Sequence, residues 1–109
     1  MVNKYNAVRT WSNLCNREFA SKAEARRGEE LKLLELAGEI SGLEYQPKFT
    51  LSAEPRITVT LDFRYIRKAP LPTGAVEVYE DVKGVLTRDS RTKYAWLQEK
   101  YGVKVEIIK

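Results

Sequence analysis

Two residues of opposite charge, Asp81 and Lys83, lie two positions apart in the run VEVYEDVKG of residues 76–84. Successive side chains of a β-strand point to opposite faces, so a strand here would place both charges on one face and its valines on the other. A carboxylate and an ammonium group side by side on a rigid strand can hold a divalent metal ion and an activated water together. The alternative is a simple ion pair on an exposed sheet edge.

Three other acidic residues are candidates for the same site. Asp62 interrupts an apolar, β-branched run, where a buried carboxylate is costly unless it is paired. Glu24 follows Ser21 by three positions in a predicted helix, so it is either a site residue or the capping-box glutamate of that serine. Glu80 falls on the valine face of the strand. A bulge or an edge position would explain it, and it stays a reserve ligand if the register shifts.

The pattern of apolar and turn residues predicts the order helix, three strands, helix, strand. The first helix begins at Ser21 and ends near Gly38, with Ala20, Ala23, Leu31 and Leu34 as its buried stripe. The predicted strands span residues 46–52, 56–68, 75–83 and 103–108, and the second helix spans residues 89–101. Residues 1–18 are weakly patterned and are expected to form an arm or a hairpin. The 109 residues should therefore form a single α/β domain, with a mixed β-sheet flanked by helices.

The composition excludes several kinds of chemistry. The chain has no histidine, so histidine metal sites and Ser-His or Cys-His nucleophiles are impossible. The single cysteine, Cys15, allows no intramolecular disulfide and suits a reducing compartment. No apolar run has the length of a transmembrane helix. We therefore expect a cytoplasmic protein that does not enter a membrane.

The net charge of +4 is unevenly placed along the chain. Residues 1–22 hold four basic residues against one acid, residues 23–82 hold eight against eleven, and residues 83–104 hold six against two. An acidic centre between basic flanks suits a metal site that grips a polyanion such as DNA, although a solvated basic surface would look the same. The candidate phosphate contacts are Lys22, Arg26, Arg27, Arg88, Arg91 and Lys93.

The order of elements, the acid on the first helix, the aspartate on the second strand and the acid-x-lysine on the third resemble the PD-(D/E)XK nuclease superfamily. Within it, the runs FASKAEARRGEELKLLELAGEI, LEYQPKFTL, LDFRY and EDVKG resemble a family of small phage endonucleases and Holliday junction resolvases. The resemblance covers residues 19–109 and implies a restriction-endonuclease-like fold. Leu61 stands where many members have proline before the aspartate. Gln46 lies in a shared QP motif to which we assign no role.

This resemblance implies a Mg²⁺- or Mn²⁺-dependent DNA endonuclease. Its catalytic positions match Glu24, Asp62, Asp81 and Lys83. Asp62, Asp81, Glu24 and the carbonyl of Val82 would hold the metal, which lowers the pKa of a water and offsets charge on the phosphate. Lys83 would orient or deprotonate the attacking water.

The favoured substrate is a branched DNA, cut by a homodimeric Holliday junction resolvase, because one small domain carries one site and symmetric cleavage of a junction needs two. Two alternatives stay open. One is a phage replication, repair or packaging nuclease with another DNA substrate. The other is a DNA-binding protein that keeps the fold without cutting.

Overall fold

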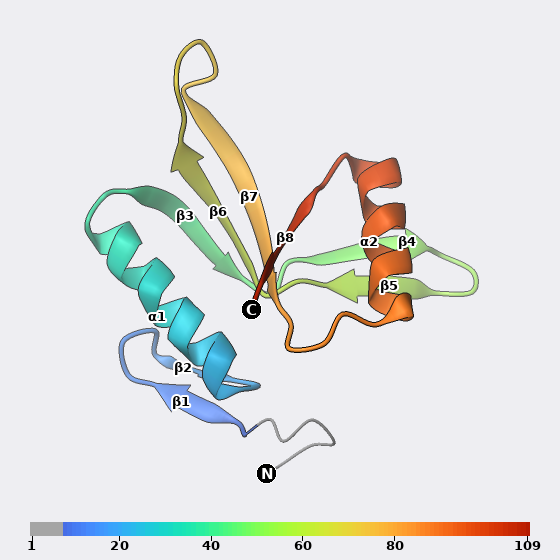
Figure 1. The fold of residues 1–109 in the computed structure, drawn as a ribbon, viewed down its shortest axis with the longest axis horizontal. Coiled ribbons are helices and arrows are strands. Elements are labelled where there is room, and N and C mark those ends of the chain that lie inside the picture. Colours follow the sequence, from blue (N-terminus) through green and yellow to red (C-terminus); the bar gives the residue numbers. More distant parts are fainter. Residues whose placement is uncertain (1–7) are drawn as a thin grey trace.

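The computed structural model describes residues 8–109, which form an α/β fold with a mixed sheet (Figure 1). The two helices are α1 (Lys22–Leu36) and α2 (Arg88–Tyr101). The sheet has the strand order β3 (Ile40–Tyr45), β6 (Phe63–Lys68), β7 (Ala75–Val82) and β8 (Val105–Ile108). Two separate hairpins pair β1 (Thr10–Ser12) with β2 (Arg17–Phe19) and β4 (Lys48–Ser52) with β5 (Ile57–Thr60).

The main sheet and its helices follow the chain order α1, β3, β6, β7, α2 and β8, which is the predicted order of helix, three strands, helix and strand. The predicted first strand over residues 46–52 is not part of this sheet, because it is β4 of the separate hairpin, and β3 takes its place. β3 pairs with β6 and β6 with β7 in antiparallel register, whereas β7 and β8 are parallel. β7 is therefore an inner strand, with a neighbour on each side. The weakly patterned start of the chain forms the β1–β2 hairpin, and the part of the expected arm before residue 8 lies outside the described residues. No helix of the described chain is long and apolar enough to cross a membrane.

The predicted strand over residues 56–68 is wrong in one respect, since it is two strands, β5 and β6, that belong to different sheets. The chain leaves the main sheet at Gln46-Pro47 and returns at Leu61-Asp62. The Gln46 N–H donates to the Asp62 carbonyl at 3.0 Å, and the Leu61 N–H donates to the Pro47 carbonyl at 2.9 Å. These two bonds close the base of the β4–β5 hairpin. Aspartate is disfavoured inside a strand, which is consistent with its position at the break.

Strand β3 was not predicted, because its sequence resembles the end of a helix. Ser41 and Gly42 look like the end of a helix, but Gly42 (φ 63°) lies where the β3–β6 register shifts. The helix itself ends earlier, at Leu36, and Gly38 (φ 79°) makes the turn. A glycine tolerates both positive φ values without steric cost.

Two hydrophobic clusters lie on opposite faces of the sheet. Under α1 the buried residues are Phe19, Ala25, Leu31, Ile40, Phe63, Tyr65 and Val78. Between the other face, α2 and the β4–β5 hairpin the buried residues are Leu51, Val59, Leu61, Leu97 and Val103. The apolar residues of the predicted strand over residues 56–68 are therefore divided between the two clusters, because the chain passes from one cluster to the other at Asp62. Of the predicted stripe of α1, only Leu31 is buried, and Ala20, Ala23 and Leu34 are exposed.

Candidate active site

Asp81 and Lys83 lie on the same face of the chain at the end of β7. The Lys83 Nζ is 3.6 Å from Asp81 Oδ2. Asp81 is only 4% exposed and β7 has strands on both sides, so the alternative of an ion pair on an exposed edge does not apply. The Lys83 N–H donates to the Ile108 carbonyl at 3.0 Å, which ties the end of β7 to β8.

Asp62 lies beside Asp81, at the break between β5 and β6. Its Oδ2 accepts a hydrogen bond from the Val82 N–H at 2.7 Å. The carboxyls of Glu24 and Asp81 are its neighbours in the same pocket. Burial, followed by these two neighbouring carboxyls, raises the pKa of Asp62 to about 10. In the absence of a cation, Asp62 therefore keeps its proton at neutral pH.

Glu24 comes to the same place from the first turn of α1, where it is buried. The Ser21 hydroxyl accepts a hydrogen bond from the Glu24 N–H at 3.1 Å, as a helix cap does. The Glu24 carboxylate accepts from the Ala20 N–H at 2.8 Å instead of returning to Ser21. The capping interpretation is therefore correct for the backbone, while the side chain also reaches Asp62. A helix N-terminus favours a negative charge at this position.

Two further groups complete the surroundings of the acids. The Lys83 N–H points toward β8, so the Val82 carbonyl, on the opposite side of the same trans peptide, points toward Asp62. The Tyr94 hydroxyl donates to Asp81 Oδ2, and burial together with this bond raises the pKa of the phenol. Tyr94 is not among the site residues predicted from the sequence. Its three-residue offset from Leu97 gave no sign of a polar partner.

The acids open into a pocket of about 880 Å³. The pocket lies between the start of α1, the strand break, the end of β7 and the start of α2. Its lining includes the four predicted catalytic residues and Val82, together with Ala20, Ser21, Lys22, Ala23, Thr60, Gly84, Val85, Thr87 and Ser90. Gln46 is not among these residues. It is exposed with φ 58°, and its backbone shapes the turn that holds Asp62.

The predicted phosphate contacts fall into three groups. Lys22 is exposed on the rim of the pocket, and Arg26, Arg88 and Arg91 are exposed on the two helices. Lys93 is half-buried and lies 3.4 Å from Asp89. Arg27 requires a correction, because its guanidinium is engaged inside the protein.

Arg27 forms a bidentate ion pair with Glu80, with nitrogen–oxygen distances of 2.8 and 2.7 Å. The Tyr65 hydroxyl also donates to Glu80, which is only 1% exposed. Glu80 is therefore neither at a bulge nor on an edge, and it is not a reserve ligand. It faces α1 on the valine side of β7, opposite to Asp81, and the pairing with Arg27 offsets the cost of burying its charge.

The three carboxyls are not arranged as a ready-made metal cluster among residues 8–109. Their oxygens are turned to the Val82 N–H, the Ala20 N–H and the Tyr94 hydroxyl. Their chemistry nevertheless suits a hard divalent cation, since the donors are all oxygen and the crowding of acids holds a proton on Asp62 that a cation could replace.

Residues 2–109 match the family model described as "Protein of unknown function (DUF1064)". The chain belongs to this family. Comparison with the curated proteins and with the solved structures found no match. Because the description of the DUF1064 family gives no activity, the function has to be argued from the site itself.

Replacing Asp62 by asparagine is expected to stabilise the metal-free protein by about 1–3 kcal/mol at neutral pH. Asparagine keeps an oxygen for the Val82 N–H and removes an ionisation that the folded state opposes. The raised pKa means that wild-type stability is lost as the pH rises from about 4 toward about 10. The gain in Tm should therefore be larger at about pH 8 than at about pH 5. Thermal melts in EDTA would measure this difference in Tm. A lower Tm for the variant would contradict the inference that the neighbouring acids destabilise the ionised form of Asp62.

Replacing Arg27 by alanine should destabilise the fold by about 3–5 kcal/mol, because it leaves the buried Glu80 charge without its partner. The neighbouring Arg26 is exposed, so Arg26→Ala is the matched control and should change stability by less than about 0.5 kcal/mol. Urea unfolding of both variants provides the comparison. Equal stabilities would show that the pair contributes nothing measurable.

Proposed function

We propose that this member of the DUF1064 family is a divalent-metal-dependent DNA endonuclease. One observation carries the proposal. Three carboxyl groups from separate elements, Glu24 of α1, Asp62 at the strand break and Asp81 of β7, meet beside the Lys83 ammonium group in one open pocket. A buried group of acids with one strongly raised pKa is unfavourable for folding, which is typical of functional sites.

The fold agrees with a restriction-endonuclease-like core. The main sheet follows the order helix, three strands, helix, strand. Glu24 lies on the first helix and Asp81 on β7, as the resemblance to PD-(D/E)XK nucleases expects, while Asp62 lies at the strand break directly before β6. The β4–β5 hairpin is an addition between the first two strands of that order. Leu61, in the place of the usual proline, is buried in the second cluster and does not disturb the aspartate after it.

The residues of the site fit Mg²⁺ or Mn²⁺. Asp62, Asp81, Glu24 and the Val82 carbonyl would hold the ion through hard oxygen ligands. When bound, such an ion supplies charge stabilisation at the scissile phosphate and lowers the pKa of water. The side chain of Lys83 would orient the attacking water and stabilise negative charge on the phosphate. Tyr94 fixes the Asp81 carboxylate through its hydroxyl. The exposed Lys22, Arg26, Arg88 and Arg91 would contact neighbouring phosphates.

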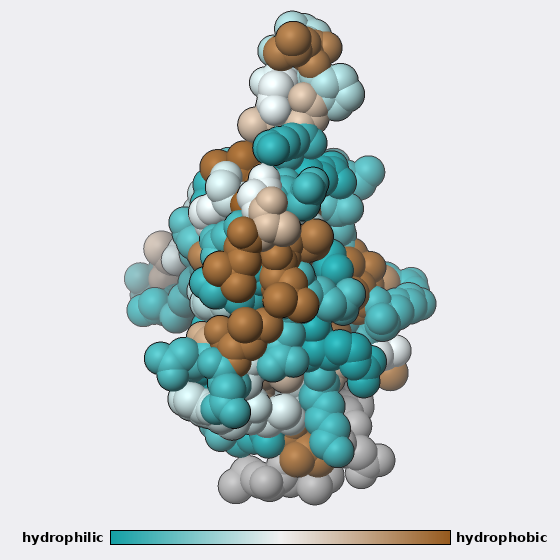
Figure 2. Space-filling view, turned by 90° about the vertical axis from the view of Figure 1, so that its left-hand side faces the viewer, coloured by the Kyte–Doolittle hydropathy of each residue, from teal (hydrophilic) through white to brown (hydrophobic). Residues whose placement is uncertain are grey.

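Within this function we favour a Holliday junction resolvase that acts as a homodimer in the cytoplasm. Symmetric cleavage of a four-way junction needs two sites related by a two-fold axis. The outer face of α1 offers a surface for such an axis, since Leu33 and Leu36 are 58% and 67% exposed. Figure 2 looks onto the side where α1 lies and shows apolar side chains gathered in the middle of that face. A nuclease with another DNA substrate, and a DNA-binding protein that does not cut, are the alternatives.

Asp81→Asn and Lys83→Ala should each reduce cleavage about 100-fold or more while leaving the Tm close to that of wild type. Lys68→Ala is the matched control, because Lys68 pairs with Ala75 at the far end of β7. Nicking of supercoiled plasmid and of a four-way junction, with Mg²⁺, with Mn²⁺ and in EDTA, provides the measurement. Wild-type rates for Lys83→Ala would exclude its role. Binding of DNA by wild type without cleavage in either metal would favour the non-cutting alternative.

Leu33→Asp combined with Leu36→Asp should convert a dimer into a monomer of 12.6 kDa. The charges would oppose burial of this face against a second copy. Leu71→Asp is the control, because Leu71 is 87% exposed at the projecting end of the β6–β7 hairpin, at the top of Figures 1 and 2. Sedimentation gives the mass, and binding in Ca²⁺ compares a junction with a duplex of equal length. A wild-type monomer that binds both alike would exclude the resolvase and leave a general nuclease.

A further inference from the structure

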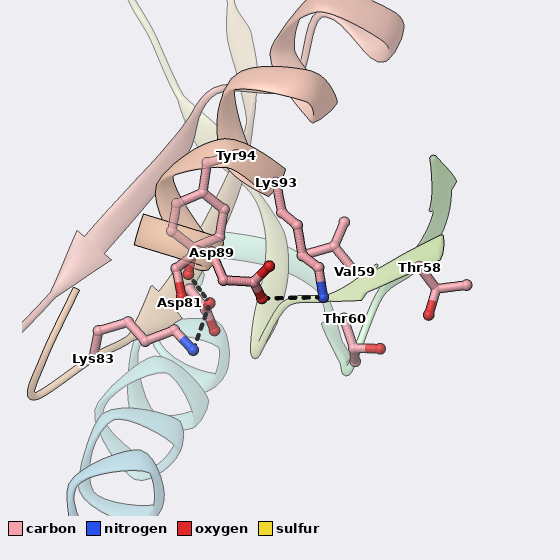
Figure 3. A pocket seen from close by; sticks show the side chains of 9 residues that line it. Thr58, Val59, Thr60, Asp81, Lys83, Asp89, Lys93 and Tyr94 are labelled. Carbon is pink, nitrogen blue, oxygen red and sulfur yellow. Dashed lines mark hydrogen bonds and ion pairs between the residues drawn. The ribbon is translucent and has the colours of Figure 1, made fainter. Parts of the chain in front are cut away.

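A second, smaller hollow of about 180 Å³ adjoins the acidic pocket on the side of α2 (Figure 3). Its lining comes from the end of β5, the end of β7 and the first two turns of α2. Thr60, Asp81, Lys83 and Ser90 line both spaces. The two hollows therefore meet at the reactive pair of Asp81 and Lys83, and an extended ligand can occupy both at once.

The chemistry of the smaller hollow suits a phosphate group. Its lining includes two lysines, Lys83 and Lys93, and the hydroxyl-bearing Thr58, Thr60 and Ser90, beside the acids Asp81 and Asp89. Hydroxyl and lysine donors are the usual partners of a nucleic-acid backbone, whereas base edges are read by other side chains. Its volume is about a fifth of that of the larger pocket, which limits it to a small group.

A carboxylate now pairs with the outer lysine of this hollow. Asp89 Oδ2 lies 3.4 Å from Lys93 Nζ, and the Asp89 side chain is 78% exposed. A dashed line in Figure 3 marks this ion pair. An exposed ion pair four residues apart on a helix contributes little free energy. A phosphate oxygen can therefore replace the Asp89 carboxylate at small cost, since Lys93 exchanges one anion for another.

We propose that this hollow binds the phosphate next to the scissile one on the same DNA strand, with Lys93 and the hydroxyls of Thr60 and Ser90 as its ligands. Asp89 holds Lys93 until DNA arrives. This subsite rests on the proposed nuclease function and adds to it the direction in which the DNA strand leaves the active site. The scissile phosphate lies at Lys83, and the backbone continues past it toward α2 and not only along α1.

The test uses duplexes in which a single neutral methylphosphonate replaces each phosphate in turn, with binding measured in Ca²⁺. Wild type should bind about fivefold more weakly when the methylphosphonate stands at one position adjacent to the scissile phosphate, because one charged contact is lost there. Lys93→Met should lose about the same factor on unmodified DNA and show no further loss at that position. Arg91→Met is the matched control on the same helix. It should weaken binding of unmodified DNA and keep the full loss at the adjacent position, because the phosphate that Arg91 contacts is a different one.

Asp89→Asn should tighten DNA binding about threefold, because Lys93 no longer has a competing carboxylate, and the gain should vanish when Lys93→Met is added. If Lys93→Met keeps the full additional loss at the adjacent position, or if Asp89→Asn acts independently of it, the subsite is wrong while cleavage by wild type still upholds the nuclease. If wild type binds no DNA, both the nuclease and the subsite are wrong.

Discussion

The site depends on one hydrogen bond, from the Val82 N–H of β7 to the Asp62 carboxyl at 2.7 Å. At Asp62 the chain stops following the β4–β5 hairpin and enters the main sheet, so Leu61 packs in one hydrophobic cluster and Phe63 in the other. The hydrogen bond fixes this crossing point against the end of β7. As a result the Asp62 side chain, which belongs to neither apolar cluster, lies next to Asp81 and close to the start of α1.

Two neighbouring residues of β7, Glu80 and Asp81, are buried acids with different surroundings. Glu80 points to α1 and is satisfied by Arg27 and Tyr65, so its charge has a permanent partner inside the protein. Asp81 points to α2, where the Tyr94 hydroxyl donates to it. The Lys83 Nζ lies 3.6 Å from Asp81 Oδ2, and the Asp62 carboxyl is a further acidic neighbour. The first arrangement ties a helix to the sheet. The second leaves an excess of acid, which favours a cation.

The sequence allowed prediction of the elements whose patterns are local. Alternation placed Asp81 and Lys83 on one face, and the capping signature placed the start of α1 one residue before the helix begins. Neither β3 nor the strand break at Asp62 could be predicted from the sequence, because both depend on pairing with distant segments. Glu80 was correctly placed on the valine face, but its partner Arg27 lies 53 residues earlier. No local pattern indicates such a pair, so Arg27 resembled any other basic residue near a basic flank.

The way the acids are held also explains why the site is not preorganised as a metal cluster in the protein alone. Each carboxyl satisfies itself with the nearest donor, a backbone N–H for Asp62 and Glu24 and a phenol for Asp81. Buried carboxylates cannot remain without donors, because the desolvation cost is too high. A divalent ion would replace the proton of Asp62 and draw the three carboxyls together, so binding of the ion and ordering of the site would be one process. Under the proposed function, the cation would supply the positive charge that the three carboxyls lack, and the scissile phosphate would meet that charge.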